Sequence, residues 1–153
     1  YLEEFNFVFI TDQIKNKINL KNVNLISGNW TKGNLNDLEM KKYYEDSFLT
    51  LVPIKNTLQP SGQSVSLQSM STGTPVLISD YEGFWDKENF AKDRNIFFID
   101  GFVFEEWAQV IRQIVSDQKQ LAYVSNSGRR LIKDSYDIDK FVSKLLKIIN
   151  KVI

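Results

Sequence analysis

The order of segments around Gly62 constrains the fold more than any other feature of this sequence. Residues 48–54 form an apolar run that is typical of a buried strand, and a polar loop containing Gly62 follows it. Residues 64–72 are suited to a short helix, and Gly73 is a natural helix stop. A strand, a loop and a helix N-terminus in this order form a corner whose free backbone N–H groups favour a bound anion. We therefore expect a phosphorylated ligand here, such as a nucleotide or nucleotide sugar, unless the corner is only a structural turn.

Apolar runs alternate with amphipathic segments along the whole chain. We predict strands at residues 5–10, 22–28, 49–54, 75–79 and 95–100. We predict helices from Asn34 or Asn36 to residue 47, over 64–72, 104–115 and 118–133, and after a capping Asp137. Most of these strands are entirely apolar. This favours a parallel sheet covered by helices on both faces, in one doubly wound, Rossmann-like three-layer α/β/α domain that spans residues 1–153.

Several side chains are predicted to pack inward or to share one apolar face of a helix. Leu38, Tyr43 and Tyr44 are placed on the inner face of the first helix, and Phe84 and Trp85 are expected to pack back onto the domain from a loop. Two later helices have apolar residues at spacings of three and four, which gives each an apolar face. Their apolar residues are Phe104, Trp107, Ala108, Ile111, Ile114 and Val115 in the first, and Phe141, Val142, Leu145, Leu146, Ile149 and Val152 in the second.

The composition excludes several classes of function. Cysteine and histidine are absent, so disulfides, Cys/His zinc sites and His-based catalytic pairs cannot form within this chain. The 19 basic and 19 acidic side chains argue against a nucleic-acid-binding protein, and we interpret the basic segment 129–133 as a solvated helix face. No apolar run approaches the roughly 20 residues of a membrane helix. Because the chain begins with Tyr1, we expect it to be part of a longer protein.

Three carboxylates follow the predicted strand at residues 75–79. Asp80, Glu82 and Asp86 could act in acid–base chemistry or hold a metal ion, because both roles are performed by clustered carboxylates. A solvated loop explains these residues more simply, and we predict no metal site.

Residues 67–76 read Leu-Gln-Ser-Met-Ser-Thr-Gly-Thr-Pro-Val, and Gly128 precedes two arginines in a predicted helix near the end of the chain. With the strand before Gly62 and the closing helices, this pattern resembles the C-terminal, donor-binding domain of GT-B fold glycosyltransferases of the group 1, or family 4, type. In that family the segment typically reads leucine, glutamate, alanine, methionine, alanine, any residue, glycine, any residue, proline and valine. The resemblance extends over nearly the whole chain.

The resemblance implies one half of a GT-B fold and an enzyme that transfers a sugar from a UDP-, GDP- or ADP-linked donor. The acceptor would be a glycan or a lipid-linked group, and the anomeric configuration would be retained. No cofactor and no catalytic metal ion are implied. The N-terminal acceptor domain and the opening strand and helix of the donor domain are missing, so we expect this fragment to be inactive alone. A role in polysaccharide biosynthesis is implied, with a cytoplasmic location or peripheral attachment at the inner face of the membrane.

By the resemblance, the loop from Ser61 to Ser64 lies under the donor diphosphate. Gly62 permits close approach of the backbone, while Gln63 and Ser64 offer N–H groups. Ser64 is also a candidate to cap the following helix. Gln68 lies one turn beyond Ser64, which places it to reach the donor ribose, although a solvent-facing glutamine is an equally good interpretation.

The base of the donor is expected beside the predicted strand at residues 22–28. Gly28 and Asn29 follow this strand and would contact the base through their backbone. Trp30 could stack on the base, but a packing tryptophan is the simpler interpretation.

Two departures from the family pattern leave the function open. Gln68 and Pro60 stand where the family carries two glutamates, and glutamine can still form hydrogen bonds but has no charge. One hypothesis is a branch of the family with a working donor site. The alternative is a non-catalytic, glycosyltransferase-like interaction domain that has lost donor binding. A flavodoxin-like or response-regulator-like signalling domain fits less well, because three helices close the chain.

Overall fold

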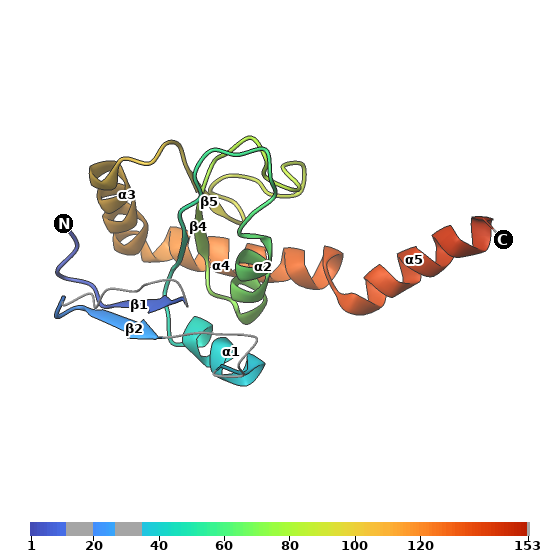
Figure 1. Cartoon of the computed structure of the whole chain (residues 1–153), viewed down its shortest axis with the longest axis horizontal. Helices are drawn as coiled ribbons and strands as arrows, with labels where there is room; N and C mark the ends of the chain where they lie inside the picture. Colours follow the sequence, from blue (N-terminus) through green and yellow to red (C-terminus); the bar gives the residue numbers. More distant parts are fainter. Residues whose placement is uncertain (12–19, 27–34, 153) are drawn as a thin grey trace. The chain divides into compact units, whose positions relative to one another are not determined.

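Short parallel strands alternate with helices in the computed structural model, which describes residues 1–11, 20–26 and 35–152 (Figure 1). The predicted α/β class with parallel strands is therefore confirmed. The chain divides into two compact units, Tyr1–Tyr43 and Tyr44–Ile153. That residues 1–153 form one domain stays a prediction.

The first unit is built on two parallel strands, β1 (Phe7–Ile10) and β2 (Val23–Ile26). The Asn22 side chain ties the segment before β1 to the start of β2, because its amide nitrogen donates to the carbonyl oxygens of Leu2 (3.1 Å) and Phe5 (2.9 Å). Both strands were predicted. They are shorter than expected within the described residues.

Helix α1 (Asp37–Glu45) begins with a reciprocal pair of hydrogen bonds. The Glu39 N–H donates to Asn36 Oδ1 (3.0 Å), and the Asn36 N–H donates to Glu39 Oε2 (2.8 Å). This capping box satisfies two backbone donors that would otherwise lack a partner at the helix start. It confirms Asn36, rather than Asn34, as the cap.

The predicted inner face of α1 is wrong at one position. Leu38 is 78% exposed, whereas Met40 and Tyr44, four residues apart, are buried. Residues four apart lie on the same face of a helix, so Met40 and Tyr44 form the buried face of α1. Leu38 lies outside that face.

The second unit contains a three-stranded parallel sheet in the order β3-β4-β5. Its strands are β3 (Thr50–Val52), β4 (Val76–Ser79) and β5 (Phe97–Ile99). Every residue of the central strand β4 is buried, as expected for a parallel strand with both faces covered. The parallel direction brings the loops that follow all three strands to the same edge of the sheet.

Four helices complete the second unit: α2 (Gln63–Thr72), α3 (Phe104–Ser116), α4 (Gln118–Ser135) and α5 (Ile138–Val152). Helix α2 packs against β3, β4 and α4, and α3 packs against α4. The predicted apolar face of α3 is confirmed at Trp107, Ala108, Ile111 and Ile114, which are buried. Phe104 is an exception at 69% exposed, because it occupies the first position of the helix.

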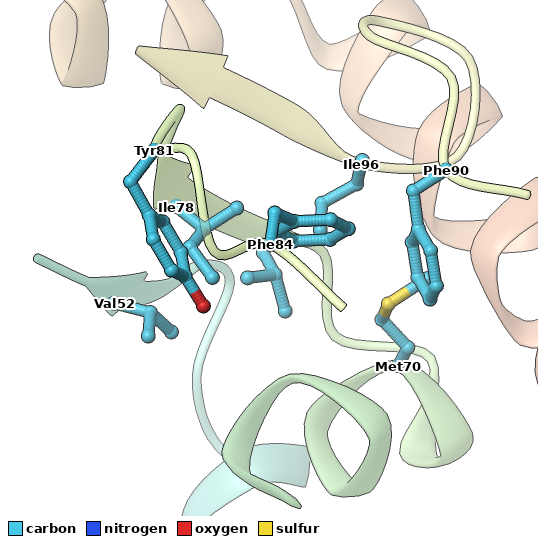
Figure 2. Close-up of a cluster of buried hydrophobic side chains, with 8 residues drawn as sticks. Val52, Met70, Ile78, Tyr81, Phe84, Phe90 and Ile96 are labelled. Carbon is cyan, nitrogen blue, oxygen red and sulfur yellow. The ribbon is translucent and has the colours of Figure 1, made fainter. Parts of the chain in front are cut away.

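Aromatic side chains from the loop after β4 fill the core between the sheet and α2. Figure 2 shows Phe84 between Ile78 and Phe90, with Met70 of α2 pointing toward Phe90. The Phe84 ring stacks on Trp85 with centroids 4.1 Å apart and meets Phe90 edge-on at 5.4 Å. The prediction that Phe84 and Trp85 pack back onto the domain is thus confirmed.

Helix α2 turns two small residues toward the sheet beside Met70. Ser66 and Ser69 are fully buried. Ser69 Oγ lies 2.9 Å from the Thr74 carbonyl oxygen and 2.8 Å from Thr50 Oγ1, so it links the end of α2 to β3. Ser66 Oγ, in contrast, has no hydrogen-bond partner among the described residues. A buried hydroxyl without a partner lowers stability.

We predict opposite effects for two serine-to-alanine substitutions in α2. Ser66→Ala removes an unpartnered hydroxyl and adds a better helix former, so it should raise the free energy of unfolding by about 1 kcal/mol. Ser69→Ala removes two hydrogen bonds and should lower it by about 1 kcal/mol. Urea denaturation followed by circular dichroism measures both. A loss of stability in Ser66→Ala as large as in Ser69→Ala would contradict this interpretation.

Candidate functional site

The site predicted from the sequence begins at Gly62, which is the N-cap of α2. Gly62 has a φ of 69°, in the left-handed region that favours glycine. A Cβ at this position would lie 2.6 Å from Val52 Cγ1 and 3.3 Å from Ile78 Cδ1. The backbone of residue 62 therefore lies directly on the ends of β3 and β4, where a side chain would not fit.

No side chain caps the start of α2. The first helical hydrogen bond runs from the Ser66 N–H to the Gly62 carbonyl oxygen (3.0 Å), so the N–H groups of the three residues between them have no acceptor inside the helix. The partial positive charge of the helix N-terminus adds to these donors. Backbone geometry thus makes this end of α2 suited to an anion.

The prediction that Ser64 caps α2 is wrong. The cap is Gly62, and Ser64 lies inside the first turn, where its side chain is exposed. Gln63 is also exposed at the first helical position. Gln63 and Ser64 still have backbone N–H groups in the first turn of α2. The predicted contact of these N–H groups with a diphosphate stays a prediction.

Tyr81 holds the loop that precedes α2, and the sequence analysis did not identify it. Its hydroxyl accepts from the Ser61 N–H (2.9 Å) and donates to the Ser61 carbonyl oxygen (2.6 Å). The Tyr81 side chain is 3% exposed and belongs to the core cluster that Figure 2 shows. Ser61 therefore uses its N–H within the fold, and the N–H groups that lack an acceptor inside α2 belong to the residues after Gly62.

Gly83 brings the loop after β4 against the loop after β3. Its N–H donates to the Thr57 carbonyl oxygen (2.9 Å), and the neighbouring Glu82 N–H donates to Asn56 Oδ1 (3.3 Å). A Cβ on Gly83 would lie 2.5 Å from the carbonyl carbon and oxygen of Leu58. The two loops at this edge of the sheet thus fit together only because residue 83 has no side chain.

We predict that Gly83→Ala lowers the free energy of unfolding by about 2 kcal/mol, because backbone atoms rather than a flexible side chain must move. Gly101→Ala is the matched control. Gly101 has a φ of 73° but open space around it, so its substitution should cost about 1 kcal/mol from backbone strain alone. Urea denaturation of both variants tests this, and equal losses would contradict the close loop contact.

Gln68 is exposed on α2 and contacts Tyr44. The Tyr44 hydroxyl donates to Gln68 Oε1 over 3.2 Å. Tyr44 is 7% exposed, and burial raises the pKa of its hydroxyl, so it remains a neutral donor. With Oε1 engaged, the amide nitrogen of Gln68 remains available as a donor.

The residues predicted to contact a base, Gly28 and Asn29, lie outside the described residues, as does Trp30. Their contribution to the site stays a prediction.

Two of the three acidic residues predicted after β4, Asp80 and Asp86, have side-chain partners within the fold. Asp80 forms an ion pair with Lys87 (2.8 Å), and the Asp86 carboxylate accepts hydrogen bonds from Asn89 Nδ2 (2.9 Å) and the Tyr136 hydroxyl. No group of His, Cys, Asp or Glu side chains in the described part of the chain could hold a metal ion. The two aspartates thus have structural contacts.

The contacts of Asp86 change its proton affinity. The hydrogen bond from Asn89 and then that from Tyr136 lower the pKa of the Asp86 carboxyl. The pKa of Tyr136 is raised by burial and by the neighbouring Asp86. The two hydrogen bonds favour the charged form of the Asp86 carboxylate, and burial keeps the Tyr136 hydroxyl protonated. The hydrogen bond between these two side chains joins the end of α4 to the loop after β4.

We predict that Tyr136→Phe raises the pKa of Asp86 toward its usual value of about 4, because a donor to the carboxylate is lost. A carboxyl whose pKa is lowered by folding stabilises the protein above its unfolded pKa and loses this effect as the pH falls through its folded pKa. The substitution should therefore cost more stability at pH 6 than at pH 3. Side-chain carboxyl NMR titration and urea denaturation measure the two effects. Equal losses at both pH values would contradict this assignment.

No protein-family model matches the sequence, and no curated protein matches it either. Solved structures do match the fold. The C-terminal domain of the group 1 glycosyl transferase family protein LpcC from Francisella tularensis superposes with a TM-score of 0.58 at 18% identity, over 77% of this chain and 55% of that chain. Anabaena Alr3699/HepE in complex with UDP-glucose superposes with a TM-score of 0.71 at 12% identity, over 98% and 43%.

Sucrose-phosphate synthase from Thermosynechococcus elongatus gives a TM-score of 0.69 at 15% identity, over 86% of this chain and 30% of that chain. The chain thus spans 30% to 55% of the length of these three proteins. The predicted resemblance is confirmed at the level of the fold: this chain has the Rossmann-like fold of the C-terminal half of GT-B glycosyltransferases.

Proposed function

We propose that this chain is the donor-binding lobe of a nucleotide-sugar-dependent glycosyltransferase, and that the start of α2 binds the donor diphosphate. The observation that carries the proposal is the glycine-capped N-terminus of α2, which has no side-chain cap and lies at the carboxyl edge of parallel strands. The fold supports it, since similar structures belong to glycosyltransferases, one of them with UDP-glucose bound.

Each predicted site residue has a role in this proposal. Gly62 lets the diphosphate approach the backbone, Gln63 and Ser64 donate through their N–H groups, and Ser61 shapes the loop. Gln68 contacts the ribose through its amide nitrogen, because Tyr44 engages its oxygen. Gly28 and Asn29 contact the base, which belongs to UDP, GDP or ADP.

The reaction follows from this placement. Transfer of the sugar leaves a nucleoside diphosphate whose negative charge grows as the glycosidic bond breaks. Backbone donors at the start of α2 stabilise that charge. An N-terminal lobe would supply the acceptor, a glycan or a lipid-linked group, and further basic side chains for the phosphates. Retention of configuration, a role in polysaccharide biosynthesis and a cytoplasmic location belong to the same proposal.

The substitution Ser64→Asp tests the site with little risk to the fold. A carboxylate in the first turn of a helix favours the helix, because it complements the helix dipole, yet it repels a diphosphate at the same place. We predict that the affinity for the bound nucleotide falls about ten-fold or more while stability is unchanged or higher. Calorimetric titration of the full-length protein with UDP, GDP and ADP measures the affinity, and thermal denaturation measures the stability.

Two further variants complete the experiment. Gln68→Ala should weaken nucleotide binding about five-fold through the loss of one hydrogen bond. Gln118→Asp, which places a carboxylate in the first turn of α4, is the matched control and should leave nucleotide binding unchanged. If the folded protein binds none of the three nucleotides, the proposal fails.

A second candidate, a non-catalytic interaction domain, is favoured by one observation. Pro60 and Gln68 stand where the glycosyltransferases that the sequence resembles carry glutamates. Absence of nucleotide binding in a folded protein would support this alternative.

A further inference from the structure

The hydroxyl of Tyr81 binds both polar backbone groups of Ser61, directly before α2. It accepts a hydrogen bond from the Ser61 N–H (2.9 Å) and donates one to the Ser61 carbonyl oxygen (2.6 Å). A tyrosine hydroxyl has a single O–H, so the Ser61 carbonyl oxygen receives the one hydrogen that Tyr81 can donate. The peptide groups on both sides of Ser61 are therefore held by one side chain.

The ring that carries this hydroxyl is itself held by the core. Tyr81 is 3% exposed and belongs to the cluster that contains Val52 and Ile78 (Figure 2). Its ring meets the Phe84 ring edge-on, with centroids 6.1 Å apart. Side chains in a close-packed core occupy well-defined rotamers. Packing therefore sets the position of the hydroxyl, and the hydroxyl in turn sets the backbone of Ser61.

The orientation of the peptide between Ser61 and Gly62 decides where the Gly62 N–H points. This peptide bond is trans, so its carbonyl oxygen and its N–H lie on opposite sides of it. Because the Ser61 carbonyl oxygen is turned toward Tyr81, the Gly62 N–H is turned away from Tyr81. No described residue accepts a hydrogen bond from this N–H. Gly62 is the N-cap of α2, so its N–H joins the donors of the first turn.

Glycine at position 62 would allow this peptide to take the opposite orientation if nothing held it. A flip would turn the φ of Gly62 from 69° to a negative value, and glycine adopts both signs of φ readily. The Ser61 carbonyl oxygen would then lie where the Gly62 N–H is now, and its partial negative charge would repel an anion that the N–H attracts. The flip would also break the hydrogen bond from the Tyr81 hydroxyl, which therefore opposes it.

We propose that Tyr81 is a positioning residue of the diphosphate site. Its hydroxyl keeps the Ser61 carbonyl oxygen turned away from the bound anion and leaves the Gly62 N–H free to donate to that anion. Tyr81 does not touch the anion and acts through the peptide between Ser61 and Gly62. This inference rests on the proposed function, because it assigns a role in binding the diphosphate of the nucleotide.

The substitution Tyr81→Phe tests the proposal, because it keeps a ring in the core and removes only the hydroxyl. We expect the affinity of the full-length protein for UDP, GDP or ADP to fall about ten-fold, which corresponds to the loss of one hydrogen bond to a charged group. The affinity for uridine, guanosine or adenosine should be unchanged, because these nucleosides lack the diphosphate. Calorimetry measures the nucleotides, and NMR titration measures the nucleosides.

Tyr136→Phe is the matched control. It also removes a tyrosine hydroxyl that forms a hydrogen bond, in this case to Asp86, so it should lower stability and leave nucleotide affinity unchanged. A second measurement follows the backbone directly. In the ¹⁵N-labelled wild-type protein, the bound nucleotide should move the Gly62 amide proton signal downfield, and Tyr81→Phe should remove this shift.

The outcomes separate this inference from the proposed function. If a nucleotide binds the wild-type protein and Tyr81→Phe with equal affinity, the role of Tyr81 is overturned and the donor site stands. The same holds if Tyr81→Phe weakens nucleoside and nucleotide equally, or if Tyr136→Phe weakens the nucleotide as much. If Tyr81→Phe does not fold, an unshifted Gly62 signal in the nucleotide-bound wild-type protein overturns the inference. If the folded wild-type protein binds none of the three nucleotides, the proposed function fails, and this inference fails with it.

Discussion

The close approach of α2 to the sheet is the contact on which the second unit depends. A parallel strand such as β4 is buried on both faces, so a helix must lie directly on it. Small residues make this possible, because Ser66 and Ser69 face inward and Gly62 has no side chain to strike Val52. The same closeness leaves the first turn of α2 without a capping side chain, so the packing of the fold and the chemistry of the candidate site have one origin.

The loops after β3 and β4, at the carboxyl edge of the sheet, are joined to each other by hydrogen bonds. Tyr81 ties the loop after β4 to Ser61, and Gly83 lets the two loops share hydrogen bonds. Behind them, the Phe84 ring connects the loops to the core that α2 and the strands enclose. An anion bound at the start of α2 would therefore meet a backbone that is already held in place, which lowers the entropy cost of binding.

Local patterns predicted much of the fold. Gly73 ends α2 in a left-handed conformation, Asn36 caps α1, and the apolar spacing of α3 matches its buried residues. Predictions of strand ends were less accurate, because an apolar residue beside a strand can be buried without pairing. Leu38 was misplaced for a related reason. Its spacing is compatible with more than one helix face, and packing selected the face of Met40 and Tyr44.

By itself, the sequence determined the order of strands and helices, the cap of α1 at Asn36, the end of α2 at Gly73, the glycine at the corner and the segregated faces of α5. These features depend on residues within a few positions of one another. The tertiary structure alone decided that Tyr81 binds Ser61, 20 residues away, and that Tyr44 binds Gln68, 24 residues away. It also made Gly62 the cap in place of Ser64. Such contacts arise when distant segments pack together, and no local periodicity encodes them.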